Sequence, residues 1–305
     1  MAKIVECVPN FSEGRRDWVI EEVLDAARSV GGVRVLEVEK DPDHNRTVVA
    51  FAGEPEPVLE AAFRTVRRAS DLIDLTHHQG AHPRIGAADV VPFVPVAGVS
   101  MAECVELARA LGRRLADELA LPVYLYGEAA TRPERRDLPN IRRGQYEGLK
   151  EEIERDPERA PDFGPSRLGP AGATIVGARP ALIAFNINLR SGDLAVAKAI
   201  ARAVRESSGG LPSVRAIGLA VAETGEVQVS LNLTDYRRTG LLAAFRAVRD
   251  EAARLGVEVA SSRIVGLVPA EALAELVVDG LQNPSFAADQ ILERALLGGS
   301  KERIL

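Results

Sequence analysis

The hydrophobic pattern of this chain runs twice through one order of elements, and that repetition limits its fold more than any other feature. In the first half, strand-like runs alternate with stretches of helical spacing, at residues 4–8, 18–27, 33–38, 47–52, 57–69 and 90–96. The second half repeats this alternation at residues 181–189, 193–206, 214–222, 226–233, 239–255 and 264–268. Both halves read β-α-β-β-α-β, the order of the ferredoxin-like split β-α-β unit. The pattern therefore predicts an α/β protein (an α+β sandwich) with two related subdomains.

The first half also contains elements beyond the repeated β-α-β-β-α-β pattern. A helix is expected at 101–119 and a strand at 123–125. A charged and then Pro/Gly-rich segment, 151–179, follows without a long periodic element, and residues 161–174 form its centre. Such a segment is typical of a linker, but its glycines also suit a loop that approaches a ligand closely. Both interpretations stay open, and we place the subdomains at 1–178 and 179–305.

Composition narrows the class of protein. With 46% hydrophobic and 27% charged residues in 305, the chain has ample material for one large or two medium domains. A formal net charge of −6 argues against a nucleic-acid partner, and no apolar run approaches the roughly 20 residues that span a bilayer. Two cysteines in apolar surroundings, Cys7 and Cys104, are expected to be buried free thiols. We expect a soluble cytoplasmic protein with no membrane association.

The histidines cluster early in the sequence, at His44, His77, His78 and His82. The spacing of His78 and His82 would put two imidazoles on one face of a helix, as in zinc sites. However, Gly80 lies between them and Pro83 follows, so a helix is not expected, and the glutamate of an HExxH site is missing. No metal site is predicted.

His82 differs from the other histidines by its position on a constrained loop that leads into an apolar strand. Loops on rigid scaffolds often carry functional groups, and imidazole is the side chain best suited to proton transfer near neutral pH. A solvated loop histidine is the alternative.

The chain resembles a known family along nearly its whole length. The matching segments are VECVPNFSEG (5–14), NRTV (45–48), HPRIGAADV (82–90), VYLYGEAA (123–130), DFGPS (162–166), FNINL (185–189), QVSLNL (228–233) and VGLVP (265–269). They are similar to the formiminotransferase domain of formimidoyltransferase-cyclodeaminase and to its stand-alone bacterial relatives.

This resemblance implies a transferase that moves the formimino group of N-formimino-L-glutamate to N5 of tetrahydrofolate, giving 5-formiminotetrahydrofolate and L-glutamate. Such a reaction belongs to histidine degradation and one-carbon metabolism. It implies two subdomains with a folate crevice between them, a homodimer, tetrahydrofolate as co-substrate and no metal. No cyclodeaminase region is expected within these residues, so a separate enzyme would take the product.

The resemblance also implies that His82 is catalytic and that a loop contacts the folate. The residues carried over to this loop are Gly164, Pro165, Ser166, Arg167 and Gly172. Residues 167–171 depart from the animal pattern, because the stretch is shorter and has no aromatic side chain. The individual folate contacts of the loop are thereby put in question.

The other candidate residues follow from the charges of the substrates. Guanidinium groups bind carboxylates, so Arg46 and Arg84 are candidate clamps, with surface ion pairs as the alternative. A carboxylate would favour the basic formimino group; Asp41 and Asp89 are the candidates, and Glu6 and Glu128 are others. Three amides are candidates for binding the pteridine edge, with hydrogen bonds at turns or strand ends as the alternative: Asn10, Asn186 and Asn188. Tyr124 and Tyr126 alternate on one strand and fit either the site or the core.

Competing functions remain at this stage. Paired ferredoxin-like units also serve as small-molecule sensors or RNA-binding modules, but 4% aromatic residues are few for base stacking. Related folate enzymes act on 5-formyltetrahydrofolate or on another donor such as formiminoglycine. A non-catalytic folate-binding protein is the third alternative, and it would have little use for His82.

Overall fold

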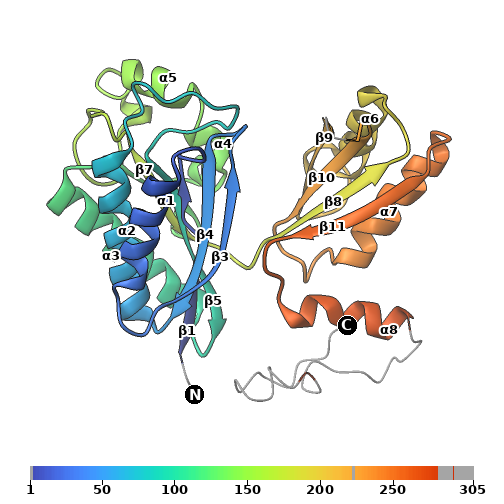
Figure 1. The fold of residues 1–305 in the computed structure, drawn as a ribbon, viewed down its shortest axis with the longest axis horizontal. Coiled ribbons are helices and arrows are strands. Elements are labelled where there is room, and N and C mark those ends of the chain that lie inside the picture. Colours follow the sequence, from blue (N-terminus) through green and yellow to red (C-terminus); the bar gives the residue numbers. More distant parts are fainter. Residues whose placement is uncertain (1–2, 222–223, 281–290, 292–305) are drawn as a thin grey trace. The chain divides into compact units, whose positions relative to one another are not determined.

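The computed structural model describes residues 3–221, 224–280 and 291, and the chain divides into two compact units, residues 1–179 and 180–305 (Figure 1). Each unit has its own hydrophobic core. Each also has its own sheet, of seven strands in the first unit and four in the second. This confirms the predicted α/β fold with two subdomains.

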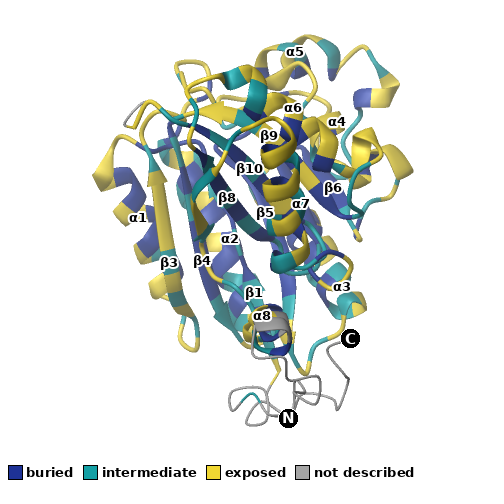
Figure 2. Cartoon of the chain, turned by 90° about the vertical axis from the view of Figure 1, so that its right-hand side faces the viewer, coloured by how far each residue is buried: buried dark blue, intermediate teal, exposed yellow. Residues whose placement is uncertain are grey.

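The elements of the first unit are β1 (Ile4–Cys7), β2 (Asn10–Phe11), α1 (Asp17–Arg28), β3 (Arg34–Asp41), β4 (Arg46–Gly53), α2 (Pro55–Leu72), β5 (Ala88–Ala97), α3 (Met101–Leu119), β6 (Val123–Gly127), η1 (Pro133–Arg136), α4 (Leu138–Ile141), α5 (Gln145–Glu152), η2 (Pro157–Arg159) and β7 (Thr174–Ala178). Helices α1, α2 and α3 lie on one face of the sheet (Figure 1). β3 is a largely exposed edge strand, whereas β5 is buried along most of its length (Figure 2).

The strand order of this sheet contains the expected ferredoxin-like unit and extends it. β1 and β2 pair antiparallel with β4 on one side and β5 on the other, and β3 is the edge strand beyond β4. β7 then lies between β5 and β6, parallel to both. The linker interpretation of 151–179 is thus wrong for its last residues, because Thr174–Ala178 is a fully buried strand.

Local signals explain where the helices begin and end. Ser100 and Glu103 form a capping box at the start of α3, and Ala120 ends it in the left-handed conformation. Pro55 starts α2, where its fixed φ suits the first helical turn. These local signals agree with the periodicity that predicts α3 at 101–119.

The second unit is a complete β-α-β-β-α-β fold. Its elements are β8 (Ile183–Leu189), α6 (Leu194–Val204), η3 (Glu206–Ser208), β9 (Val214–Ala220), β10 (Val227–Leu233), α7 (Leu241–Arg254), β11 (Val259–Val265), η4 (Ala270–Leu273) and α8 (Ala274–Gly280). The sheet order is β11-β8-β10-β9, with every pair antiparallel. The last strand begins and ends earlier than the predicted 264–268, since its polar, exposed middle hides it from the hydrophobic pattern.

In β8 the residues alternate between buried and partly exposed, so one face packs on the core. Asn186 and Asn188 lie on the other face. In the described parts of the chain, no helix is both long and apolar enough to cross a membrane.

Candidate functional site

The loop that carries His82 is fastened to the turn between β3 and β4. The side-chain amide of Asn45 donates to the carbonyl of Gln79 at 3.0 Å. Gly80 packs so closely against this turn that a Cβ on it would lie 2.3 Å from the carbonyl oxygen of His44. Glycine is therefore needed at position 80, and the loop holds His82 against the end of the sheet.

The imidazole of His82 is half-buried beside a second imidazole. The ring centroids of His44 and His82 lie 6.4 Å apart in an edge-to-face arrangement, and Asp41 accepts a 2.6 Å hydrogen bond from Nδ1 of His44. The pKa of His82 falls to about 3, first because burial disfavours the imidazolium. The positive charges of Arg46 and Arg142 lower it further, whereas Asp41 raises it. At neutral pH the ring is an uncharged proton acceptor.

Two guanidinium groups complete this site. Arg46 donates through Nε to Oδ1 of Asn10 at 2.9 Å, and Arg142 donates through Nε to Oδ2 of Asp89 at 3.0 Å. The other carboxylate oxygen of Asp89 accepts a 2.8 Å hydrogen bond from the backbone N–H of Ile85. Asp89 thus joins Arg142 to the segment that follows His82. Two sequence candidates, Asp41 and Arg46, act on His82 through their charges, and two more, Asn10 and Asp89, hold the arginines.

Sequence reasoning missed two residues of the cluster, His44 and Arg142. His44 lies in a polar loop, and its pairing with Asp41 three residues earlier was a readable local signal. Arg142 lies just after α4 in an arginine-rich stretch, RPERRDLPNIRR at 132–143, so the composition does not single it out. Only the folding of that stretch back onto the start of β5 brings it to Asp89, 53 residues earlier.

Arg84 is differently placed from the other clamp candidate, Arg46. Its guanidinium is buried and donates to the ring nitrogen Nδ1 and the carbonyl of His78, to Gln145 and twice to Glu147, at 2.7–3.2 Å. All five N–H donors are engaged. In this state Arg84 ties the histidine loop to α5, and its role as a substrate clamp stays a prediction.

The predicted folate loop begins and ends on glycines that pack against protein backbone. Gly164 and Gly172 have φ of +84° and +72°, and a Cβ on either would lie 2.2 Å from a carbonyl oxygen. Pro165, Ser166 and Arg167, between them, are exposed. The two glycines shape the loop, and the three exposed residues remain its candidates for contact with a ligand.

The remaining candidates, Asn186 and Asn188, belong to the second unit. Asn188 donates to Ser261 at 3.1 Å and accepts from Gln228 at 2.8 Å, within the second unit. Asn186 is on the same strand face, so both amides belong to a polar sheet surface of that unit. Their predicted contact with the pteridine stays a prediction.

The first unit also contains four side chains whose roles the sequence did not decide. Glu128 forms an exposed ion pair with Arg136. Glu6 is half-buried in β1, and burial raises the pKa of its carboxyl. Tyr124 and Tyr126 are 2% and 4% exposed, which makes both part of the core.

The two cysteines, Cys7 and Cys104, are buried free thiols, as expected. Burial raises the pKa of Cys104 to about 12, so it stays protonated. Among the described side chains, no three histidine, cysteine or acidic groups come together as a metal site.

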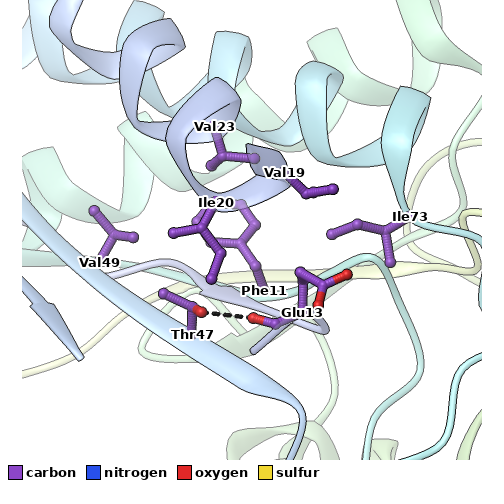
Figure 3. Close-up of a pocket in the computed structure, with 8 residues that line it drawn as sticks. All are labelled: Phe11, Glu13, Val19, Ile20, Val23, Thr47, Val49 and Ile73. Atoms are coloured by element: carbon purple, nitrogen blue, oxygen red, sulfur yellow. Dashed lines mark hydrogen bonds between the residues drawn. The ribbon is translucent and has the colours of Figure 1, made fainter. Parts of the chain in front are cut away.

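His82 lines neither a small cavity nor a groove found in the described part of the first unit. The cavity has a volume of about 10 Å³ and is lined by Phe11, Glu13, Val19, Ile20, Val23, Thr47, Val49 and Ile73. It lies between α1 and the sheet (Figure 3). It has room for one water at most, so it is a packing void. A groove of about 510 Å³ lies where the ends of α2 and α3 meet residues 169–172.

Comparisons with known proteins agree with these observations. A family model described as the formiminotransferase domain, N-terminal subdomain, matches residues 4–179, and one described as the formiminotransferase domain matches 184–278. Glutamate formimidoyltransferase of Thermoplasma acidophilum is 48% identical over 295 residues, which cover 96% of this chain and 97% of that protein. The Streptococcus pyogenes protein of that name is 43% identical over 98% of this chain and 100% of its own. Mouse formimidoyltransferase-cyclodeaminase is 49% identical over 90% of this chain but only 52% of its own length.

Proposed function

Because the chain belongs to the formiminotransferase family, we propose that it is a glutamate formimidoyltransferase whose base is His82. The enzyme transfers the formimino group of N-formimino-L-glutamate to N5 of tetrahydrofolate and releases L-glutamate. The observation that carries the assignment of the base is a half-buried, uncharged imidazole beside two guanidinium groups on the first unit.

The reaction needs one proton acceptor and one proton donor. The lone pair of N5 attacks the amidine carbon of the donor, and N5 loses its proton to His82 as the tetrahedral intermediate forms. The bond from the former amidine carbon to the glutamate nitrogen then breaks, and the imidazolium returns its proton to that nitrogen. One imidazole serves both steps, and such assistance contributes about 10²–10⁴-fold.

The charges around His82 suit this role. Burial and the two arginines keep the ring uncharged before the substrates bind, so it is ready to accept a proton. Asp41 holds His44 at the edge of the ring and opposes the effect of the arginines. Arg46 and Arg142 favour the anionic groups that the donor carries.

Further proposals follow from the family. The exposed loop residues Pro165, Ser166 and Arg167, the clamp Arg84, and the amides Asn186 and Asn188 are proposed to contact substrate. A homodimer is proposed, and a separate cyclodeaminase as the consumer of the product, since the two microbial relatives carry only the transferase name. Buried free thiols suit a reducing cytoplasm.

The test is direct. Purified protein is mixed with tetrahydrofolate and N-formimino-L-glutamate, and the 5-formimino product is followed by absorbance after acid treatment. Formiminoglycine and 5-formyltetrahydrofolate are assayed in parallel, because either could be the substrate of a related enzyme. Absence of turnover with every donor, together with intact folate binding, would reduce the protein to a folate-binding one.

The role of His82 is tested by His82→Ala, with His77→Ala as the matched control, because the side chain of His77 is 87% exposed. We expect His82→Ala to lose at least about 100-fold in kcat while its affinity for tetrahydrofolate changes little. His77→Ala should resemble the wild type. Near-normal turnover of His82→Ala would remove this residue from the mechanism.

A further inference from the structure

The two guanidinium groups at the site are each held along one edge only. Arg46 reaches Asn10 with Nε and Nη2, and Arg142 reaches Asp89 with Nε and Nη2. Within the described residues, no hydrogen bond occupies Nη1 of either. Each arginine is therefore fixed in orientation by its anchor and keeps donors for a ligand, unlike Arg84, whose five donors are all engaged.

The anchors of these arginines are neighbours in the sheet. Asn10 on β2 pairs with Val90 on β5, and Asp89 is the residue just before Val90. Adjacent strands lie about 4.8 Å apart. The two guanidinium groups consequently share one end of the sheet, next to the loop of His82.

Among the described residues, no carboxylate is hydrogen-bonded to the guanidinium group of Arg46. Asp89 is 3% exposed and supplies one carboxylate to Arg142, whereas Arg46 is held by the neutral amide of Asn10. Burial, and next the charge of Arg142, lowers the pKa of Arg46, whereas the carboxylates of Asp89, Glu39 and Asp41 raise it. An anion between the two guanidinium groups would offset their mutual repulsion, and a carboxylate matches two such forks.

We propose that the free edges of Arg46 and Arg142 bind the α-carboxylate of the formimino donor, which makes Arg142 a specificity-determining residue. This inference rests on the proposed function. In N-formimino-L-glutamate the α-carboxylate is attached to the carbon that bears the reacting nitrogen, whereas the side-chain carboxylate lies two carbons farther along. A carboxylate subsite beside the base therefore selects the nearer group.

The subsite explains how the donor is oriented. With the α-carboxylate held by two guanidinium groups, the amidine nitrogen lies towards His82, which must return a proton to it. An uncharged amide in place of the α-carboxylate loses both charge-assisted hydrogen bonds and leaves the arginines unpaired. The side-chain carboxylate is free to contact other parts of the protein.

The experiment compares N-formimino-L-glutamate with two amides, N-formimino-L-glutamine and N-formimino-L-isoglutamine. Each amide lacks one of the two carboxylate charges of the acid. Only N-formimino-L-isoglutamine has its α-carboxylate amidated. For the wild type we expect kcat/KM to be about 10- to 100-fold lower with N-formimino-L-isoglutamine than with N-formimino-L-glutamine. Binding of each donor to the protein without folate is measured by calorimetry as a second readout.

The protein variants are Arg142→Gln and Arg142→Lys, with Arg143→Gln as the matched control, because Arg143 is exposed and adjacent. In Arg142→Gln the ratio of kcat/KM for N-formimino-L-glutamate to kcat/KM for N-formimino-L-isoglutamine should fall at least about threefold below the wild-type ratio, because only Arg46 is left to bind the α-carboxylate. The KM for tetrahydrofolate should stay within about twofold of the wild-type value. Arg142→Lys should recover part of the affinity for the acid. Arg143→Gln should keep the wild-type ratio.

The possible outcomes distinguish failure of the α-carboxylate subsite from failure of the proposed function. If the wild type turns over no formimino donor, the proposed function fails. If it turns over N-formimino-L-glutamate but Arg142→Gln keeps the ratio of the wild type, the function stands and the inference is overturned. A larger penalty for glutamine than for isoglutamine would overturn it too, as would a loss confined to tetrahydrofolate.

Discussion

Replacing His82 by asparagine should make the protein less sensitive to acid, even though it removes the proposed base. The pKa of His82 is lowered from 6.5 to about 3 in the folded chain, chiefly by burial and next by Arg46 and Arg142. Below pH 6.5 the unfolded state takes up a proton here that the folded state does not. The contribution of this group to stability is therefore complete above pH 6.5 and is lost as the pH falls towards 3.

The size of the effect follows from the proton linkage. Each pH unit below 6.5 reduces the free energy of unfolding by about 1.4 kcal/mol while the folded ring stays unprotonated. At about pH 5.0 the wild type should have lost about 2 kcal/mol through His82 alone. Asparagine does not titrate in this range. Between about pH 7.5 and 5.0 the free energy of unfolding of His82→Asn should therefore fall by about 2 kcal/mol less than that of the wild type.

The assay is urea unfolding of both proteins at the two pH values. The single tryptophan, Trp18, lies in α1, so its emission reports on the first unit. Circular dichroism at each urea concentration checks that helix is lost in the same transition. Carboxylates shared by the two proteins titrate alike, and their effect cancels in the comparison.

His77→Asn is the control, because it makes the same chemical change at a side chain that is 87% exposed. It should follow the wild type at both pH values. Equal losses of stability by the wild type and His82→Asn between the two pH values would refute the reasoning. They would mean that His82 is as well hydrated in the folded chain as in the unfolded one.

Three further predictions test the surroundings of the site. Arg142→Gln should raise the pKa of the His82 imidazole, because the guanidinium charge lowers it, and NMR titration of the ring protons measures the shift. Arg135→Ala should destabilise the first unit by about 3–5 kcal/mol in urea unfolding, because Asp162, 7% exposed, would be left as a buried carboxylate without its 2.7 Å ion pair. Gly172→Ala should cost at least about 2 kcal/mol and Gly169→Ala about 1 kcal/mol or less, measured by thermal melting, because φ is +72° and space is lacking only at position 172.

Much of the fold is readable from the sequence because its signals are local. The helix at 101–119 has its period and its capping box within its own residues, and the structure places α3 at Met101–Leu119. The buried strand β7 is different. Its five residues, Thr174–Ala178, follow a Pro/Gly-rich loop, and their partners β5 and β6 are parallel strands far away in the sequence. Nothing local distinguishes such a strand from the end of a linker.

The same limit applies to the site. His82 is identifiable because its loop carries glycine, proline and a family motif. Arg84 has an equally good motif, but its five donors are filled by partners that include Glu147, 63 residues later. Arg142 has no motif and reaches the site through a carboxylate on β5. The sequence shows which charged side chains are present, whereas the fold determines which of them keep free hydrogen-bond donors for a ligand.

The placement of charge gives His82 a proton affinity that depends on its ligand. The guanidinium groups proposed to bind the donor also depress the pKa of His82, so its imidazole is uncharged and weakly basic. A carboxylate bound between Arg46 and Arg142 compensates their charge and removes part of this depression. With the donor bound as proposed, His82 therefore becomes a stronger base. Binding and basicity are coupled through two arginines, which is why removing one of them should alter the pKa of the ring as well as the affinity for the donor.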